Sequence, residues 1–181
     1  MAEPAGAPAR RRVFFAVWPD APAAGALAAA AQCAAVTCGG RPTRRENLHI
    51  TLAFVGEVED ARIDLLRATG GALAFEAFDL ELERLGYWRH NRIVWAGARS
   101  VPAPLAALAD GLNRELRAAG YRLDDKPFAA HITLLRKANC TGDLPRIEPI
   151  RWKVAEFVLV ESVLDAGGSI YTPVARFACQ R

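Results

Sequence analysis

Two stretches of this chain alternate apolar and polar residues with a period of two, which is the pattern of a half-buried β-strand. The first stretch runs from Leu48 to Phe54 and puts His49 and Thr51 together on one face. The residues expected on the other face, toward the core, are all apolar: Leu48, Ile50, Leu52 and Phe54.

The second stretch, residues 130–136, repeats the tetrapeptide His-Ile-Thr-Leu letter for letter. His131 and Thr133 share the polar face, while Ile132 and Leu134 point inward. Along either strand the imidazole and the hydroxyl lie about 7 Å apart, at about 3.3 Å per residue. Because Ile-Thr-Leu is common in strands, a chance repeat is the alternative to a functional pair.

The remaining pattern divides the chain into two similar halves, each with the order strand, helix, strand. Apolar or alternating runs predict strands at residues 13–18, 78–85, 92–98, 152–164 and 170–177. Helical spacing predicts helices at residues 19–36, 59–73 and 102–119. A turn at Gly167-Gly168 would join the last two strands as a hairpin. We therefore expect an α+β fold with two pseudo-symmetric lobes, antiparallel sheets flanked by helices, and an active-site cleft between the lobes.

Length and charge fit one soluble domain. The 181 residues suffice for a single core, which we expect over residues 12–181, after a disordered tail at residues 1–11. The net charge of +3 permits a polyanionic partner without requiring one. No run of 18 apolar residues and no signal-peptide pattern occur, so we expect a cytoplasmic protein without a membrane span.

The four cysteines, Cys33, Cys38, Cys140 and Cys179, have neither Cys-x-x-Cys spacing nor a nearby histidine. We therefore expect four free thiols in a reducing compartment and no metal site.

The repeated motif points to acid–base chemistry on a phosphate. Histidine has an ordinary pKa of about 6.5, so two copies can supply one proton donor and one proton acceptor near neutral pH. Two residues after each histidine, a threonine can donate a hydrogen bond to an anionic oxygen. The third histidine, His90, lacks such a threonine and is expected on the surface.

At this point the sequence resembles the 2H phosphoesterase superfamily, and within it the RNA 2′,3′-cyclic phosphodiesterases, also called 2′-5′ RNA ligases. Five segments carry the resemblance: Arg12–Val17, Glu46–Gly56, Arg92–Gly97, Pro127–Arg136 and Tyr171–Phe177. One departure is Ala130, where a proline often precedes the second histidine.

The resemblance implies metal-free hydrolysis of RNA 2′,3′-cyclic phosphate ends to 2′-phosphomonoesters, with no cofactor. It implies that His49 is the proton donor and His131 the proton acceptor, although the residues themselves do not order these roles. Thr51 and Thr133 would bind the phosphate oxygens. We expect the protein to act as a monomer on RNA. A 2′-5′ RNA phosphodiesterase or ligase, or a non-catalytic nucleotide-binding module, are the alternatives.

Residues near the motifs add candidates for substrate binding. Arg136 could bind a phosphate oxygen bidentately, or be a solvated arginine at a strand end. Tyr87 and Trp88 lie in a loop rich in aromatic and basic residues, which could stack on a nucleobase or simply connect two strands.

Overall fold

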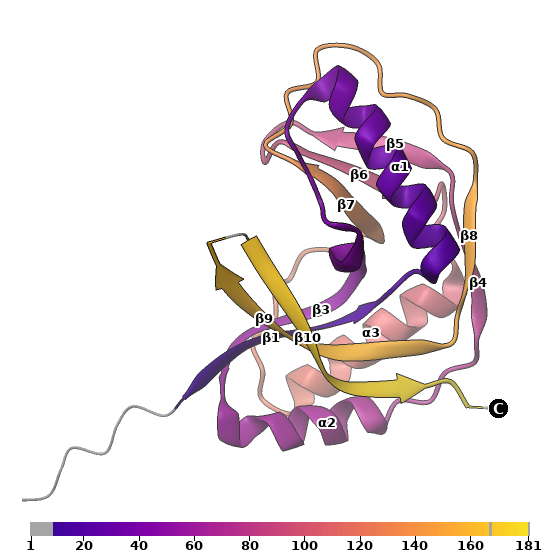
Figure 1. Cartoon of the computed structure of the whole chain (residues 1–181). Helices are drawn as coiled ribbons and strands as arrows, with labels where there is room; N and C mark the ends of the chain where they lie inside the picture. Colours follow the sequence, from indigo (N-terminus) through magenta and orange to yellow (C-terminus); the bar gives the residue numbers. More distant parts are fainter. Residues whose placement is uncertain (1–8, 167, 181) are drawn as a thin grey trace, which may run out of the picture.

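The computed structural model describes residues 9–166 and 168–180, which form mostly strands with three α-helices among them (Figure 1). The strands are β1 (Arg10–Val17), β2 (Arg41–Pro42), β3 (Ile50–Glu59), β4 (Phe78–Leu82), β5 (Arg84–Trp88), β6 (Ile93–Gly97), β7 (His131–Arg136), β8 (Ile150–Val154), β9 (Glu156–Asp165) and β10 (Gly168–Ala178). The helices are α1 (Ala21–Cys38), α2 (Ile63–Gly71) and α3 (Ala103–Ala118), with 3-10 turns at Arg45–Asn47 and Asp60–Arg62.

One eight-stranded sheet runs through both lobes, in the order β10-β9-β1-β3-β7-β6-β5, with β2 added beside β7. The lobes meet where β3 and β7 pair antiparallel, through Ile50 and Ile132. A separate two-stranded sheet, β4-β8, runs along one side between the lobes (Figure 1). The α+β architecture with antiparallel strands is confirmed, and the two half-sheets expected from the sequence prove to be continuous.

Each half has a matching unit in which two antiparallel strands are joined through a helix: β1–α1–β3 and β6–α3–β7. Each of these helices packs against the motif strand of the other half: α1 contacts β7, and α3 contacts β3. Helix α3 buries a stripe formed by Leu105, Leu108, Leu112 and Leu116, as its spacing predicts. Because each helix covers the other half's motif strand, both motif strands have one face in the core and one face free.

Both motif strands contain an irregularity at the same place. In the pairing of β1 with β3, Phe15 lies opposite Ala53 but Ala16 lies opposite Thr51, so Leu52 is an extra residue. In the pairing of β6 with β7, Leu134 is skipped in the same way. An extra residue of this kind is a β-bulge, and it reverses which face the following side chains take.

The bulge corrects one prediction. Phe54 was expected in the core by simple alternation, but it is 47% exposed, and Ala53 is buried in its place. In β7 the same reversal buries Leu135 and leaves Arg136 exposed. The fifth residue after each motif histidine, Phe54 in one copy and Arg136 in the other, therefore lies on the face of the histidines.

Two predicted strands each prove to be two strands in different sheets. The predicted strand 152–164 is divided at Ala155 into β8 and β9, and the predicted strand 78–85 is divided into β4 and β5. The alternation in fact changes parity at each break, where the chain turns a corner: Arg84 and Glu156 stand where the period of two calls for an apolar residue. The hairpin between β9 and β10 is confirmed by their pairing, although Gly167 of its turn lies outside the described residues.

The N-terminal strand starts earlier than expected, at Arg10, so the last two residues of the predicted tail belong to β1. Residues 1–8 of that segment lie outside the described residues. Helix α1 begins after Asp20, whose carboxylate accepts a hydrogen bond from the amide of Ala23, and ends at Gly39, whose φ is 59°.

Within the described residues, α1 is the single helix long and apolar enough to cross a membrane by length and composition. It is rich in alanine, and Leu27, Ala31 and Ala34 on one of its faces are buried in the core. Such a face is what a core helix of a globular domain needs, so we treat α1 as part of the core.

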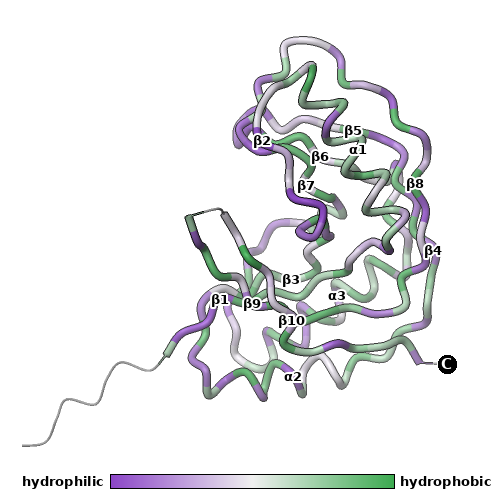
Figure 2. Tube along the Cα trace, viewed as in Figure 1, coloured by the Kyte–Doolittle hydropathy of each residue, from purple (hydrophilic) through white to green (hydrophobic). Residues whose placement is uncertain are grey.

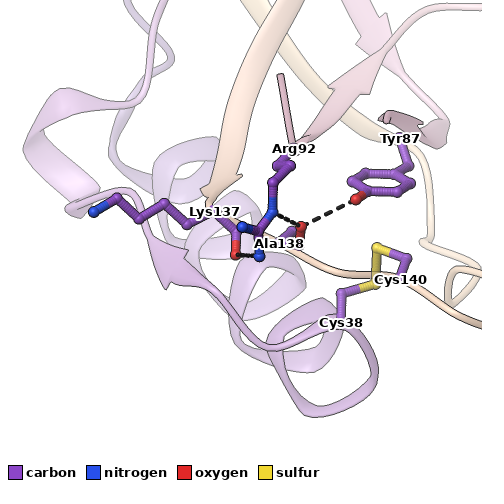
Figure 3. The surroundings of a disulfide bond; sticks show 6 residues. All are labelled: Cys38, Tyr87, Arg92, Lys137, Ala138 and Cys140. Carbon is purple, nitrogen blue, oxygen red and sulfur yellow. Dashed lines mark hydrogen bonds between the residues drawn. A yellow bond between two sulfur atoms is a disulfide. The ribbon is translucent and has the colours of Figure 1, made fainter. Parts of the chain in front are cut away.

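The expectation of four free thiols is wrong. Cys38, at the end of α1, forms a disulfide with Cys140, which follows β7, and only Cys33 and Cys179 are free (Figure 3). Their sequence separation of 102 leaves no local spacing signal. Beside the disulfide, the side chains of Tyr87 and Arg92 both donate hydrogen bonds to the carbonyl of Ala138. These contacts fix the segment that leaves β7 after Arg136.

Candidate active site

A cleft of about 1050 Å³ lies along the free face of β3 and β7. Its lining contains all five site residues predicted from the sequence: His49, Thr51, His131, Thr133 and Arg136. The two motifs, far apart in sequence, thus form one cavity.

The strand register sets how the four motif side chains are arranged. Because β3 and β7 are antiparallel and Ile50 pairs with Ile132, the next residues place His49 across from Thr133 and Thr51 across from His131. Each imidazole therefore has a hydroxyl along its own strand and another across from it. This arrangement surrounds a small anion with two imidazoles and two hydroxyls.

His49 is enclosed by aromatic rings. Trp18 stacks on it at 4.9 Å between ring centroids, and Phe14 and Tyr171 approach at 5.0 and 5.2 Å. Burial in this apolar setting lowers the pKa of His49 to about 4, and the positive charges of Arg136 and His131 act in the same direction. Unliganded His49 is therefore neutral at pH 7.

Hydrogen bonds set the tautomer of His49. Its Nδ1 lies 2.7 Å from the carbonyl oxygen of Asn47, which can only accept, so Nδ1 carries the proton. The lone pair is then on Nε2, 3.2 Å from the hydroxyl oxygen of Thr51. The side chain of Asn47 donates in turn to the carbonyl of Ser169, which ties this turn to β10.

His131 has the same tautomer in a more open setting. Its Nδ1 lies 2.7 Å from the carbonyl oxygen of Ala129, so Nε2 again faces the cleft with a lone pair. Trp88 contacts the ring edge to face at 4.6 Å. Burial lowers the pKa of His131 below its ordinary value, and the charge of Arg136 adds to that effect.

The cleft is suited to a negatively charged ligand. Its lining includes Arg12, Arg41, Arg44 and Arg136 and, among the described residues, no aspartate or glutamate. Arg41 lies directly opposite Arg136 in the pairing of β2 with β7. Like charges opposite each other are unfavourable unless an anion lies between them. Figure 2 shows β2 and the turn after it as hydrophilic.

Sequence reasoning missed several residues of the cleft. Phe14, Arg41 and Tyr171 line the cleft but come from strands without a motif, and only the fold brings them near the histidines. Trp18, which follows β1, does not line the cleft itself but stacks on His49. An aromatic residue just before the first helix was the one local signal available, at Trp18.

Tyr87 and Trp88, expected in a loop, instead end strand β5, where they pair with Val94 and Ile93 of β6. Trp88 lines the cleft, whereas the hydroxyl of Tyr87 bonds to Ala138 away from it. His90 is exposed in the turn between β5 and β6 and is not among the residues that line the cleft.

No group of three histidine, cysteine, aspartate or glutamate side chains that could hold a metal ion occurs within residues 9–166 and 168–180. A smaller cavity of about 460 Å³ lies behind Trp18 and Tyr171, and its lining mixes acidic and basic side chains.

The known proteins that this chain resembles in sequence and fold are phosphoesterases. The model of the LigT-like phosphoesterase family matches two successive stretches, residues 17–95 and 97–171, each of which contains one motif copy. A relative from Escherichia coli, named RNA 2′,3′-cyclic phosphodiesterase, is 38% identical over 141 residues, which cover 77% of this chain and 80% of the relative. A relative of the same name from Thermus thermophilus is 32% identical, over 92% of this chain and 89% of its own.

Among solved structures, E. coli LigT complexed with 3′-AMP superposes with a TM-score of 0.88 at 33% identity. The match covers 96% of this chain and all of that one. Sequence, fold and the two halves of the family model agree: this chain belongs to the LigT-like phosphoesterases of the 2H family.

Proposed function

We propose that this protein hydrolyses RNA 2′,3′-cyclic phosphate ends to 2′-phosphomonoesters by a two-histidine mechanism that needs no metal ion. The observation that carries the proposal is the paired arrangement of His49, Thr51, His131 and Thr133 in a cleft with arginines and no described carboxylate. The names of the relatives, RNA 2′,3′-cyclic phosphodiesterase, support the same substrate.

In the proposed reaction, Nε2 of His131 takes a proton from a water molecule as the water oxygen attacks phosphorus. The bond from phosphorus to the 3′ oxygen breaks, and Nε2 of protonated His49 gives its proton to that oxygen, which leaves the phosphate on the 2′ oxygen. Thr51, Thr133 and Arg136 donate hydrogen bonds to the non-bridging oxygens as charge develops on them.

The proton balance depends on the substrate. Both histidines have lowered pKa values in the free protein, so the donor must gain a proton when the substrate binds. The negative charge of the cyclic phosphate favours the imidazolium and raises both pKa values. The donor hydrogen bond from each Nδ1 to a backbone carbonyl also favours the protonated ring.

The environments of the two histidines support the order of roles. His131 lies in the more open part of the cleft, where water can reach its Nε2, as a base that activates water requires. His49 lies among aromatic rings that exclude water, as suits a residue that protonates the leaving oxygen.

We propose further that residues 12–181 act as one bilobal domain, and as a monomer in the cytoplasm, where the RNA is found. Disulfides are rare in reducing compartments. The redox state of Cys38 and Cys140 in protein alkylated inside cells is therefore a direct check on this location.

The function is tested with a 2′,3′-cyclic dinucleotide in the presence of EDTA. We expect a 2′-phosphate product by phosphorus NMR, and no turnover by a His49→Ala/His131→Ala double variant. A 3′-phosphate product would contradict the role of His49 as donor to the 3′ oxygen. Binding without turnover would favour the nucleotide-binding module, and joining of 2′-5′ ends would favour the ligase.

A further inference from the structure

The cleft has an apolar end that the proposed reaction does not use. Phe54 lines the cleft and is 47% exposed, on the same face as His49 and Thr51. The bulge at Leu52 puts it there, as the equivalent bulge at Leu134 does for Arg136. The two motif copies thus end differently, one in a guanidinium and the other in an aromatic ring.

Arg12 accompanies Phe54. Its guanidinium lies over the Phe54 ring, 4.9 Å from the centroid, and it also lines the cleft. The neighbouring arginines, Arg10 and Arg11, form ion pairs with Glu57, Asp60 and Glu161. Arg12 forms none with a carboxylate of the described residues, so its charge is directed to the cleft.

An exposed ring with an arginine beside it is the pattern of a subsite for single-stranded nucleic acid, where the ring stacks on a base and the arginine contacts a phosphate. Because Leu52 is bulged out, Thr51 and Phe54 lie opposite Ala16 and Phe14, two strand positions apart, or about 7 Å at 3.3 Å per residue. Trp88, in contrast, touches His131 itself. Phe54 is therefore placed beyond the reacting nucleotide.

We propose that Phe54 and Arg12 bind the second nucleotide of the RNA, the one on the 5′ side of the cyclic-phosphate end. Phe54 stacks on its base, and Arg12 contacts the phosphate that joins it to the terminal nucleotide. A cyclic 2′,3′-phosphate closes the 3′ end of a strand, so every further nucleotide lies on the 5′ side. This inference rests on the proposed function and adds that the enzyme prefers an oligonucleotide to a mononucleotide.

The test compares kcat/KM for a 2′,3′-cyclic mononucleotide with that for a cyclic dinucleotide that ends in the same nucleotide. Wild type should favour the dinucleotide. Phe54→Ala should lower the ratio of the two values by about tenfold, within the range that one base–aromatic stack contributes. Phe54→Tyr, which keeps a ring, should restore the ratio. Arg12→Gln should lower the ratio and make dinucleotide binding less dependent on salt, by a slope of about 0.7 for one phosphate contact.

Matched controls come from α2, away from the cleft. Leu65→Ala removes an apolar side chain that is 43% exposed, and Arg67→Gln removes an exposed arginine, so neither should change the ratio. Circular dichroism and thermal melting establish that each variant is folded.

Each remaining outcome is informative. If Phe54→Ala lowers both values equally, or changes neither, the subsite is overturned while the proposed function stands. If wild type hydrolyses neither substrate, the proposed function is overturned and the subsite with it.

Discussion

The two copies of His-Ile-Thr-Leu are identical in sequence and differ in surroundings. Trp18 follows Val17, the partner of Ile50, and so lies across from His49, where it stacks on the imidazole. The equivalent partner of His131 is Gly97. A side-chain Cβ at Gly97 would come within 2.8 Å of the Trp95 ring, so that space is already filled and His131 receives no ring from β6.

This difference explains why the two histidines differ in electrostatics. Burial is the largest cause of the lowered pKa at both sites, and His49, enclosed by three aromatic rings, is the one lowered to about 4. The same four residues can thus supply a water-excluded donor and a water-accessible acceptor, because the strand beside each motif is different.

The largest effect should come from removing either imidazole. His49→Ala and His131→Ala should each lower kcat/KM for a cyclic dinucleotide by about a hundredfold or more, the usual scale for general acid–base catalysis. Steady-state kinetics on folded protein checks this. A near-normal rate for one variant would show that the two copies are not a catalytic pair.

Removing a threonine hydroxyl should have the second-largest effect on the rate, and the loss should differ between the two motif copies. Loss of one hydrogen bond to a charged oxygen costs about 1.5–3 kcal/mol, or roughly tenfold to a hundredfold in rate if it acts in the transition state. Thr51→Ala should be the more harmful, since Thr51 also contacts Nε2 of His49. Equal losses for Thr51→Ala and Thr133→Ala would mean that this extra contact has no role in catalysis.

Removal of Trp18 should make the copies more alike. In Trp18→Ala the pKa of His49 should rise from about 4 toward its ordinary value, because water can then reach the imidazole of His49 and solvate its charged form. Histidine NMR signals followed against pH measure it directly. Trp88→Ala is the matched change beside His131, and it should change the pKa of His131 by less than Trp18→Ala changes the pKa of His49.

The lowered pKa of His49 also sets the direction of the stability change. The unfolded chain binds the proton at about pH 6.5 and the folded chain only at about pH 4, so the unfolded state holds more protons in between. The free energy of unfolding should therefore fall as pH drops through that window, and less so in Trp18→Ala. Denaturant titrations at several pH values would reveal a contrary sign.

The pH dependence of the rate should follow from the same values. The profile of kcat/KM should be bell-shaped and lie toward acid pH, because it reports the lowered pKa values of the free protein. The pH profile of kcat should lie at higher pH than that of kcat/KM, since the bound phosphate raises the pKa values of both histidines. Each single histidine variant should lose one limb, and a flat profile between about pH 5 and 9 would exclude the two-histidine mechanism.

Removing metal ions with a chelator should have the smallest effect on activity. An imidazole pair that moves both protons needs no Lewis acid, so activity should survive excess EDTA. Loss of activity that a divalent ion restores would show that the two copies do not act alone.

The sequence by itself determined the motif, the face on which it lies and the position of the three helices, but not where the predicted strands 78–85 and 152–164 divide. A period of two places His49 beside Thr51 and His131 beside Thr133, because alternation is a local property of a strand. Two histidines in matching strands predict one shared cleft. In the fold, His49 and His131 do line the same cleft. The roles of the five site residues stay a prediction for the experiments above.

Tertiary structure decided what depends on neighbours distant in the chain. The bulges that turn Phe54 and Arg136 to the cleft arise from pairing with β1 and β6, not from the motif strands alone. Cys38 meets Cys140 only because α1 ends beside the exit of β7. The aromatic cage of His49 combines β1 with β10. Local patterns fix which way a side chain points on its strand, whereas long-range pairing fixes what it meets and, through burial, how strongly it holds a proton.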